Sequence, residues 1–271
     1  MNLLRPRDRH LTVNGLRLRL LDWGGDGRQP LLLLHGFTGH AHAWDTLSIA
    51  LQPRYHVYAL DQRGHGESDH ADTYGPLVGA DDVAGVVDQL GLDAMVLIGL
   101  SMGGRNAMIF TAKRPEAVAK LVIVDIGPEV SKRASEPSTG PEEPPTWESI
   151  EQAAQHLYRS NPNPGIHYYR WVVSHSLRAR PDGALVWGWH PSVKERRTVV
   201  DVDWWATLRS ITPPTLVLRG EDSPILDRDV AERMARELPQ GRFVEIPRAR
   251  HTLHEDNPDA VLKALDEFLG R

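Results

Sequence analysis

The feature that most constrains the fold of this chain is a Gly-x-Ser-x-Gly sequence directly after a run of apolar residues. The apolar run is residues 95–98, and the motif is residues 99–103, with Ser101 at its centre. In such a sequence a buried strand breaks at a sharp turn and continues as a helix, and the serine is held in a strained backbone conformation with its hydroxyl exposed. A side chain at either glycine would collide where the strand and the helix fold back on each other. The sequence therefore predicts a nucleophile elbow, with Ser101 as the candidate nucleophile.

The composition favours one large α/β domain, or a core that carries an insertion, and excludes several classes of function. The chain has 271 residues, a formal net charge of −5 and no cysteine, which excludes disulfides, thiolate metal sites and a cysteine nucleophile. It has no basic run of the kind that nucleic-acid binding needs, and no apolar stretch near the ~18 residues of a membrane span. Its first residues lack the apolar core of a signal peptide. We therefore expect a cytoplasmic protein with neither a nucleic-acid partner nor a membrane span, and the oligomeric state stays open.

Short apolar runs predict a mostly parallel sheet. Residues 11–20 alternate between apolar and polar side chains around Asn14-Gly15, which is the pattern of a β-hairpin. Continuous apolar runs, typical of parallel strands covered on both faces, follow at residues 30–34, 55–60, 95–98, 121–124, 215–218 and 243–246. Helical patterns lie between many of them. This order predicts an α/β fold in which a mostly parallel, eight-stranded sheet has helices on both faces.

One region interrupts the alternation of strands and helices. Residues 131–146 are rich in proline, glutamate and serine, and predict a linker or mobile loop. Two amphipathic helical patterns follow, at about residues 147–160 and 166–178, and six of the eight tryptophans lie in this part of the chain. We expect a helical cap inserted into a core, with residues 1–128 and 211–271 forming the core and residues 129–210 the cap.

Candidates for the catalytic partners of Ser101 follow the last two predicted strands. A serine nucleophile needs a general base, and the base needs an orienting carboxylate. Asp222 and His251 each come shortly after one of these strands, so both are expected at the carboxyl edge of the sheet, where ligand crevices form. The alternatives, one base and two carboxylates, are His254, Asp125 and Asp227.

Several of these segments resemble the motifs of capped, esterase-like α/β-hydrolases, and the resemblance covers essentially the whole chain. Leu-His-Gly-Phe at residues 34–37 resembles the oxyanion loop of that family. Residues 61–68, Asp-Gln-Arg-Gly-His-Gly-Glu-Ser, resemble the turn that the family carries after its next strand. Arg-Gly-Glu-Asp at residues 219–222, and His251 followed by Pro258, resemble its acid and base segments.

The resemblance implies a serine hydrolase with an α/β-hydrolase fold. Ser101 would be the nucleophile, His251 the general base and Asp222 the orienting acid, and the backbone N–H groups of Phe37 and Met102 would form the oxyanion hole. The expected reaction is hydrolysis of a small to medium carboxylic ester or lactone through an acyl-enzyme. Carbon–carbon hydrolases, lyases, amidases and perhydrolases share this triad, and a non-catalytic ligand receptor can use the same scaffold, so these alternatives stay open.

Two further patterns concern binding. His254 and Glu255 near His251 could suggest a metal site, but the His-Glu-x-x-His pattern of zincins is absent, so we expect no metal and no cofactor. His35 is expected to shape the oxyanion loop. Large aromatic side chains often line small-molecule pockets, and an apolar or aromatic substrate is expected to contact Trp147, Trp171, Trp187, Trp204 and Trp205.

Overall fold

The computed structural model describes residues 5–131, 146–189, 193, 196 and 201–270. Nearly all of the predicted linker at 131–146 therefore lies outside the described residues. None of the helices in the described part of the chain combines the length and the apolar composition that crossing a bilayer requires.

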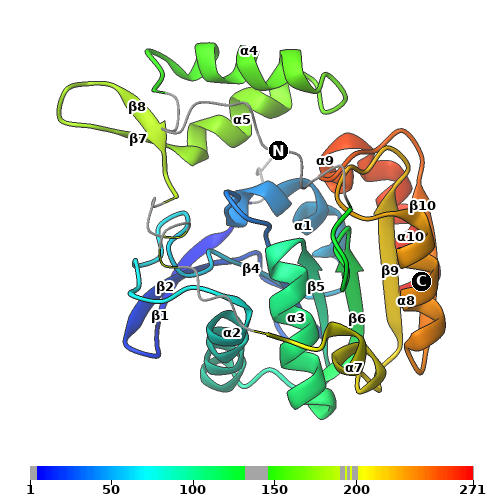
Figure 1. The fold of residues 1–271 in the computed structure, drawn as a ribbon. Coiled ribbons are helices and arrows are strands. Elements are labelled where there is room, and N and C mark those ends of the chain that lie inside the picture. The colour runs from blue at the N-terminus through cyan, green and yellow to red at the C-terminus, as the bar shows by residue number, and fades with distance from the viewer. Residues whose placement is uncertain (1–4, 132–145, 190–192, 194–195, 197–200, 271) are drawn as a thin grey trace.

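The main sheet has eight strands in the order β1-β2-β4-β3-β5-β6-β9-β10 (Figure 1). β1 and β2 form an antiparallel hairpin at one edge, and β2 is antiparallel to β4. All other neighbouring strands are parallel, which confirms the predicted mostly parallel sheet. The strands are β1 (Arg7–Val13), β2 (Leu16–Asp22), β3 (Pro30–Leu34), β4 (His56–Leu60), β5 (Met95–Leu100), β6 (Val118–Val124), β9 (Thr215–Gly220) and β10 (Gly241–Ile246).

Helices cover both faces of this sheet because successive strand residues point to opposite sides. In β3, Leu32 and Leu34 belong to one buried cluster and Leu31 and Leu33 to the other. The first cluster is covered by α2 (Pro76–Leu90), α3 (Met102–Lys113), α7 (Trp204–Arg209) and α8 (Arg228–Glu237). The second is covered by α1 (Asp45–Leu51), α9 (Leu253–Asp256) and α10 (Pro258–Leu269), with the short helix η1 (Ala41–Trp44). A second short helix, η2 (Pro115–Ala117), precedes β6.

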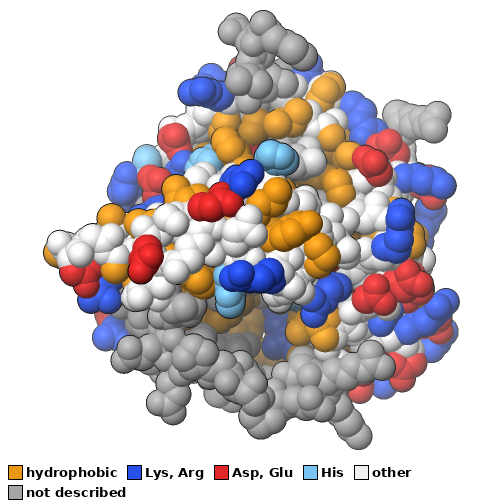
Figure 2. Space-filling view, turned by 90° about the horizontal axis from the view of Figure 1, so that it is seen from above, with side chains coloured by type: hydrophobic (Ala, Val, Ile, Leu, Met, Phe, Trp, Pro, Cys, Tyr) orange, Lys and Arg blue, Asp and Glu red, His pale blue; other side chains and the backbone are white. Residues whose placement is uncertain are grey.

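The segment between β6 and β9 contains a separate layer above the sheet. It consists of α4 (Ile150–Ser160), α5 (Ile166–Ser176) and the hairpin of β7 (Leu177–Ala179) and β8 (Leu185–Trp187) (Figure 1). These elements have a small core of their own, which includes Trp147, Tyr169 and Val173. Seen from above, apolar side chains are scattered between charged ones over this face of the molecule (Figure 2). We interpret this layer as the predicted cap.

The end of the inserted segment packs differently. α7 contacts α3 and α8, and Trp204 and Trp205 pack against the main hydrophobic core. We therefore place the end of the cap before Trp204, earlier than the predicted boundary at residue 210. At the other end, the backbone N–H of Ser131 donates a hydrogen bond to the carbonyl of Ile225, 2.9 Å away.

Candidate active site

Ser101 occupies the turn between β5 and α3 in the conformation predicted for an elbow. Its φ is 53° and its ψ −113°, a region that residues other than glycine rarely adopt. A Cβ added at Gly103 would collide with the backbone carbonyl of Leu34, and one at Gly99 would collide with the carbonyl of Gly103. The two glycines therefore allow the close contact between strand and helix that holds Ser101 in this strained turn.

The loop after β3 lies directly beside Ser101. A Cβ added at Gly36 would be 3.3 Å from the Cβ of Ser101. The next residue is Phe37, and in the described part of the chain neither its backbone N–H nor that of Met102 donates to another backbone oxygen. These two N–H groups remain our proposed oxyanion donors, because both belong to residues that flank Ser101 in space.

His35 fixes the shape of this loop. Its Nδ1 is 2.8 Å from the carbonyl oxygen of Gly36, and its Nε2 is 3.0 Å from the backbone nitrogen of Gln62. Because the Gln62 N–H can only donate, Nε2 accepts and Nδ1–H donates to Gly36. Burial lowers the pKa of His35 to about 4, so the ring is neutral near pH 7. Its role here is to position the backbone of the loop.

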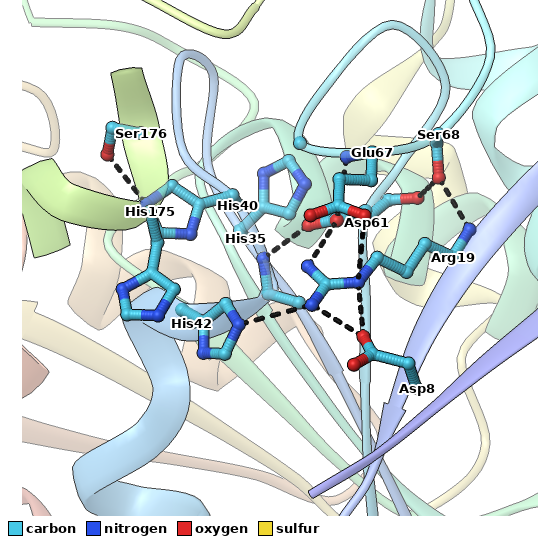
Figure 3. Close-up of polar contacts among 12 residues, drawn as sticks. Asp8, Arg19, His35, His40, His42, Asp61, Glu67, Ser68, His175 and Ser176 are labelled. Carbon is cyan, nitrogen blue, oxygen red and sulfur yellow. Dashed lines mark hydrogen bonds and ion pairs between the residues drawn. The ribbon is translucent and has the colours of Figure 1, made fainter. Parts of the chain in front are cut away.

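The turn at residues 61–68 supports the same loop through Asp61 (Figure 3). The Asp61 carboxylate accepts hydrogen bonds from the backbone N–H groups of Ala41, at 2.6 Å, and Glu67, at 3.0 Å, and the Arg19 guanidinium is 3.3 Å away. Burial raises the pKa of Asp61, but a positive charge on His35 and these two N–H groups act in the opposite direction, and the net result is a lowered pKa. Ser68 donates from its hydroxyl to the Asp61 carbonyl. The turn is therefore a structural support of the oxyanion loop.

Contacts from the cap meet the core beside this support. His40 Nε2 is 2.7 Å from the hydroxyl of Ser176 in α5, and the rings of His42 and His175 are 4.0 Å apart (Figure 3). These contacts join the end of α5 to the segment that follows the oxyanion loop. A shift of α5 in the cap would therefore also move the residues that follow the oxyanion loop.

His251 pairs with Asp125, and this corrects the predicted acid. Its Nδ1 is 2.8 Å from Oδ2 of Asp125. Asp125 directly follows β6 with a φ of 49° and is fully buried, at 0% exposed. Its carboxylate also accepts hydrogen bonds from the backbone N–H of Gly220, at 3.1 Å, and from the hydroxyl of Ser223, at 2.5 Å. Two further donors, the Gly220 N–H and the Ser223 hydroxyl, thus hold the carboxylate in place for its hydrogen bond with His251.

Asp222, the predicted acid, lies at the surface. Its backbone N–H donates to the carbonyl of Ala249, at 2.9 Å, and the residue is exposed. The physical reason is the tight turn after β9, in which Gly220 packs so closely on the chain before His251 that a Cβ there would collide with it. This turn directs Ser223, and not Asp222, into the site. The sequence signal for Asp125 was its position directly after β6.

Ser101 and His251 border two adjoining cavities. A cavity of about 550 Å³ under the cap is lined by His251, Leu100, Trp187 and other residues. A second cavity, of about 500 Å³, is lined by Ser101 and Met102, and Phe37 lines both. In the described part of the chain the Ser101 hydroxyl is not hydrogen-bonded to His251. Such contacts are often long in ligand-free enzymes and tighten when the substrate binds.

Of the five tryptophans predicted to line the pocket, only Trp187 is among the described residues that line these cavities. Trp147 is buried in the small core of the cap. Trp171 is 49% exposed, and its Nε1 donates to Asp45. Trp204 and Trp205 pack on the main core, where Trp205 also lies under the Arg233 guanidinium, 3.8 Å from its ring centre. The number of tryptophans in this part of the sequence does not tell which of them line a cavity, which are buried in a core and which are exposed.

Two other tryptophans, Trp44 and Trp189, line the cavity under the cap, and the sequence analysis did not assign them to a pocket. Trp189 packs against Phe37, with ring centres 5.8 Å apart, and Trp44 stacks on His254, at 4.1 Å. His254 is buried, and burial lowers its pKa to about 3, so it is a poor base. In the described part of the chain, no three His, Asp or Glu side chains come together in a way that would hold a metal ion.

Comparisons with known proteins give the family of the chain. A model of the alpha/beta hydrolase family matches residues 31–264. The 2-(acetamidomethylene)succinate hydrolase of Mesorhizobium japonicum is 28% identical over 250 residues, which cover 90% of this chain and 89% of that protein. Esterase YbfF of Escherichia coli is 25% identical over 260 residues, which cover 89% of this chain and 93% of the esterase. The crystal structure of E-2-(acetamidomethylene)succinate hydrolase has a TM-score of 0.86 at 26% identity, with 97% of this chain and 99% of that one covered. Because the family model spans most of its length, the chain belongs to the alpha/beta hydrolase family.

Proposed function

We propose that this protein is a serine hydrolase that cleaves small to medium carboxylic esters, with Ser101 as nucleophile, His251 as general base and Asp125 as orienting acid. The observation that carries the proposal is the hydrogen bond between the buried carboxylate of Asp125 and Nδ1 of His251, at 2.8 Å, together with a serine in the strained turn after β5. A buried carboxylate on Nδ1 of a histidine near such a serine is the arrangement of a catalytic triad.

The proposed mechanism follows from these contacts. The Asp125 carboxylate accepts the Nδ1–H of His251, which leaves the lone pair of Nε2 free to take the hydroxyl proton of Ser101 as it attacks the acyl carbonyl. The negative oxygen of the tetrahedral intermediate would be bound by the N–H groups of Phe37 and Met102, and losing one such donor typically costs about 3 kcal/mol of barrier. His251 then protonates the leaving group, and later activates the water that hydrolyses the acyl-enzyme.

The relatives support this class of reaction and also favour a second candidate. Esterase YbfF supports ester hydrolysis. The similarity to a hydrolase of 2-(acetamidomethylene)succinate favours, as the second candidate, hydrolysis of a substrate with an acylamino group by the same residues. Neither candidate needs a cofactor. A cytoplasmic location stays a prediction from the sequence.

The first experiment is steady-state hydrolysis of p-nitrophenyl esters from acetate to decanoate by the wild type and by Ser101→Ala. Many turnovers that disappear in Ser101→Ala would support the proposal, and the best chain length would report the depth of the acyl cavity. Equal rates in the two proteins, or no turnover by the wild type, would refute ester hydrolysis at this serine. Acylamino substrates would then be tested next.

A further inference from the structure

The carboxylate of Asp256 joins the chain that carries His251 to the cap. Asp256 is the last residue of α9. Its Oδ2 accepts a hydrogen bond, at 2.6 Å, from the backbone N–H of Arg250, the residue directly before His251. Its Oδ1 accepts a second hydrogen bond, also at 2.6 Å, from Nδ2 of Asn161, the residue that follows α4 in the cap. One side chain therefore contacts both the loop of the proposed general base and the cap.

The directions of these two hydrogen bonds follow from the chemistry of the groups. An ionised carboxylate only accepts, and a backbone N–H only donates. The amide of Asn161 is oriented by its own loop, because its Oδ1 accepts from the backbone N–H of Asn163, 3.3 Å away, and this turns Nδ2 toward Asp256. Asp256 and Asn161 are both half-buried. Each oxygen of Asp256 is therefore used by a donor from a different part of the molecule.

Two more hydrogen bonds run between the loop that joins α4 to α5 and the chain before His251. Nη1 of Arg250 donates to the carbonyl of Ser160, the last residue of α4, at 3.1 Å. Nδ2 of Asn163 donates to the carbonyl of Arg248, at 3.2 Å. Residues on both sides of this connection line the cavity under the cap, namely Ser160, Asn161, Arg250 and His251. The connection therefore lies at the wall of the proposed substrate cavity.

The peptide before His251 is the part of this chain that Asp256 controls. On the core side, the Ala249 carbonyl accepts a hydrogen bond of 2.9 Å from the backbone of the loop after β9. The core therefore fixes Ala249, whereas Asp256 fixes the N–H of the residue that follows it. Because Nδ1 of His251 is held by Asp125, a tilt of the peptide before His251 turns the ring about that hydrogen bond. Such a turn changes the distance from Nε2 to Ser101.

We propose that Asp256 is a positioning residue for the general base, and that through Asn161 it makes the position of His251 depend on the cap. This inference rests on the proposed serine hydrolase function, in which Nε2 of His251 takes the hydroxyl proton of Ser101. A cap held through Asn161 keeps the Asp256 carboxylate, and with it the peptide before His251, in place for that transfer. A misplacement of about 1 Å, caused by a change outside the reacting groups, can lower the rate about 100-fold.

The test exchanges the two partner side chains. Asp256→Asn offers one oxygen to two donors, so it keeps one of the two hydrogen bonds and directs its NH₂ group at the other donor. Asn161→Asp brings two carboxylates together, and these repel each other. In the double variant Asn161→Asp/Asp256→Asn, the new amide oxygen accepts from Arg250, and the new NH₂ group donates to the carboxylate at position 161. The double variant therefore restores both hydrogen bonds with the same total charge as the wild type.

The assay is p-nitrophenyl butyrate hydrolysis at pH 7, with kcat and KM measured separately. Each single variant should lower kcat and kcat/KM alike, by about tenfold, and the double variant should return to within about twofold of the wild type. Asp259→Asn is the control, because it makes the same carboxylate-to-amide change at an exposed residue of α10, and its rate should stay within about twofold. Thermal unfolding of each variant identifies a folding defect, and if one single variant does not fold, the other and the double variant decide.

A second measurement separates this inference from the proposed function. NMR relaxation dispersion of the His251 ring should show microsecond-to-millisecond exchange in the single variants beyond that of the wild type, the double variant and Asp259→Asn. An unchanged kcat in both single variants, or a double variant no better than either of them, would overturn the role of Asp256 while ester hydrolysis stands. Absence of Ser101-dependent hydrolysis in the wild type would instead overturn the proposed function. The ring dynamics then decide, and equal exchange in all these proteins would refute the inference.

Discussion

Replacement of Asp125 by asparagine tests the proposed triad most directly. In the wild type, Oδ1 of Asp125 faces the N–H of Gly220, and Oδ2 faces both the Ser223 hydroxyl and Nδ1 of His251. An asparagine must keep its oxygen toward Gly220, because two N–H groups cannot share a hydrogen bond. Its NH₂ group is then directed at His251. The histidine must accept at Nδ1 and carry its proton on Nε2, the nitrogen that should deprotonate Ser101.

The expected cost follows from this change of tautomer. Asparagine in place of a triad aspartate lowers kcat by about 10⁴-fold, which is about 5 kcal/mol of barrier at about 1.36 kcal/mol per factor of ten. Asp222→Asn is the matched control, and its rate should stay within about twofold, since exposed substitutions away from the site change little. The assay is p-nitrophenyl butyrate hydrolysis at pH 7, with thermal unfolding to confirm that both variants fold. Full activity in Asp125→Asn with a large loss in Asp222→Asn would refute the assignment.

Three other expectations concern stability and specificity. Gly103→Ala should cost about 1–3 kcal/mol in urea unfolding, because the added methyl meets the Leu34 carbonyl; an unchanged midpoint would contradict the packing of the elbow. Trp187→Ala should enlarge the cavity under the cap and move the best acyl chain to longer esters, whereas Trp171→Ala, outside that cavity, should leave the optimum in place. Stability should fall on acidification below pH 6.5. Four buried histidines have pKa values of about 3 or 4 and stay neutral in the folded protein, whereas in the unfolded chain they bind protons as the pH falls below 6.5. They are His35, His40, His65 and His254. His254→Phe should reduce that slope by about 1.4 kcal/mol per pH unit between about pH 6 and 4.5, and an identical slope would argue against a neutral buried ring.

The local signals in the sequence were sufficient for the fold and for the elbow. The apolar runs have the length and spacing of the strands, and Gly99 and Gly103 are required by contacts between immediate neighbours in the fold. The model of the alpha/beta hydrolase family and the sheet order confirm the predicted architecture. The strands and the elbow depend on contacts between close neighbours and on the periodicity of apolar residues, and both can be recognised in a single sequence.

The partner of His251 could not be decided in the same way. Asp125 and Asp222 both follow strands of the sheet, and β6 and β9, which precede them, are neighbours. The choice depends on how the turn after β9 directs its side chains, which is set by the packing of Gly220 against the distant chain before His251. The tryptophans pose the same problem, because the ring of Trp187 and the ring of Trp147 are equally apolar and differ only in what packs around them.

The contact between Ser131 and Ile225 has a consequence for the engineering of this scaffold. The chain that leaves Asp125 is fastened to the loop after β9 by this hydrogen bond before it continues into the cap, and it rejoins the core at Trp204 in α7. Asp125 therefore lies in the part of the chain that belongs to the core, before the Ser131–Ile225 contact and outside the segment between Ser131 and Trp204. A cap from another member of the family, grafted after Ser131 and before Trp204, would change the residues that cover the substrate cavity. The Asp125 carboxylate would keep its hydrogen bonds from Gly220, Ser223 and His251.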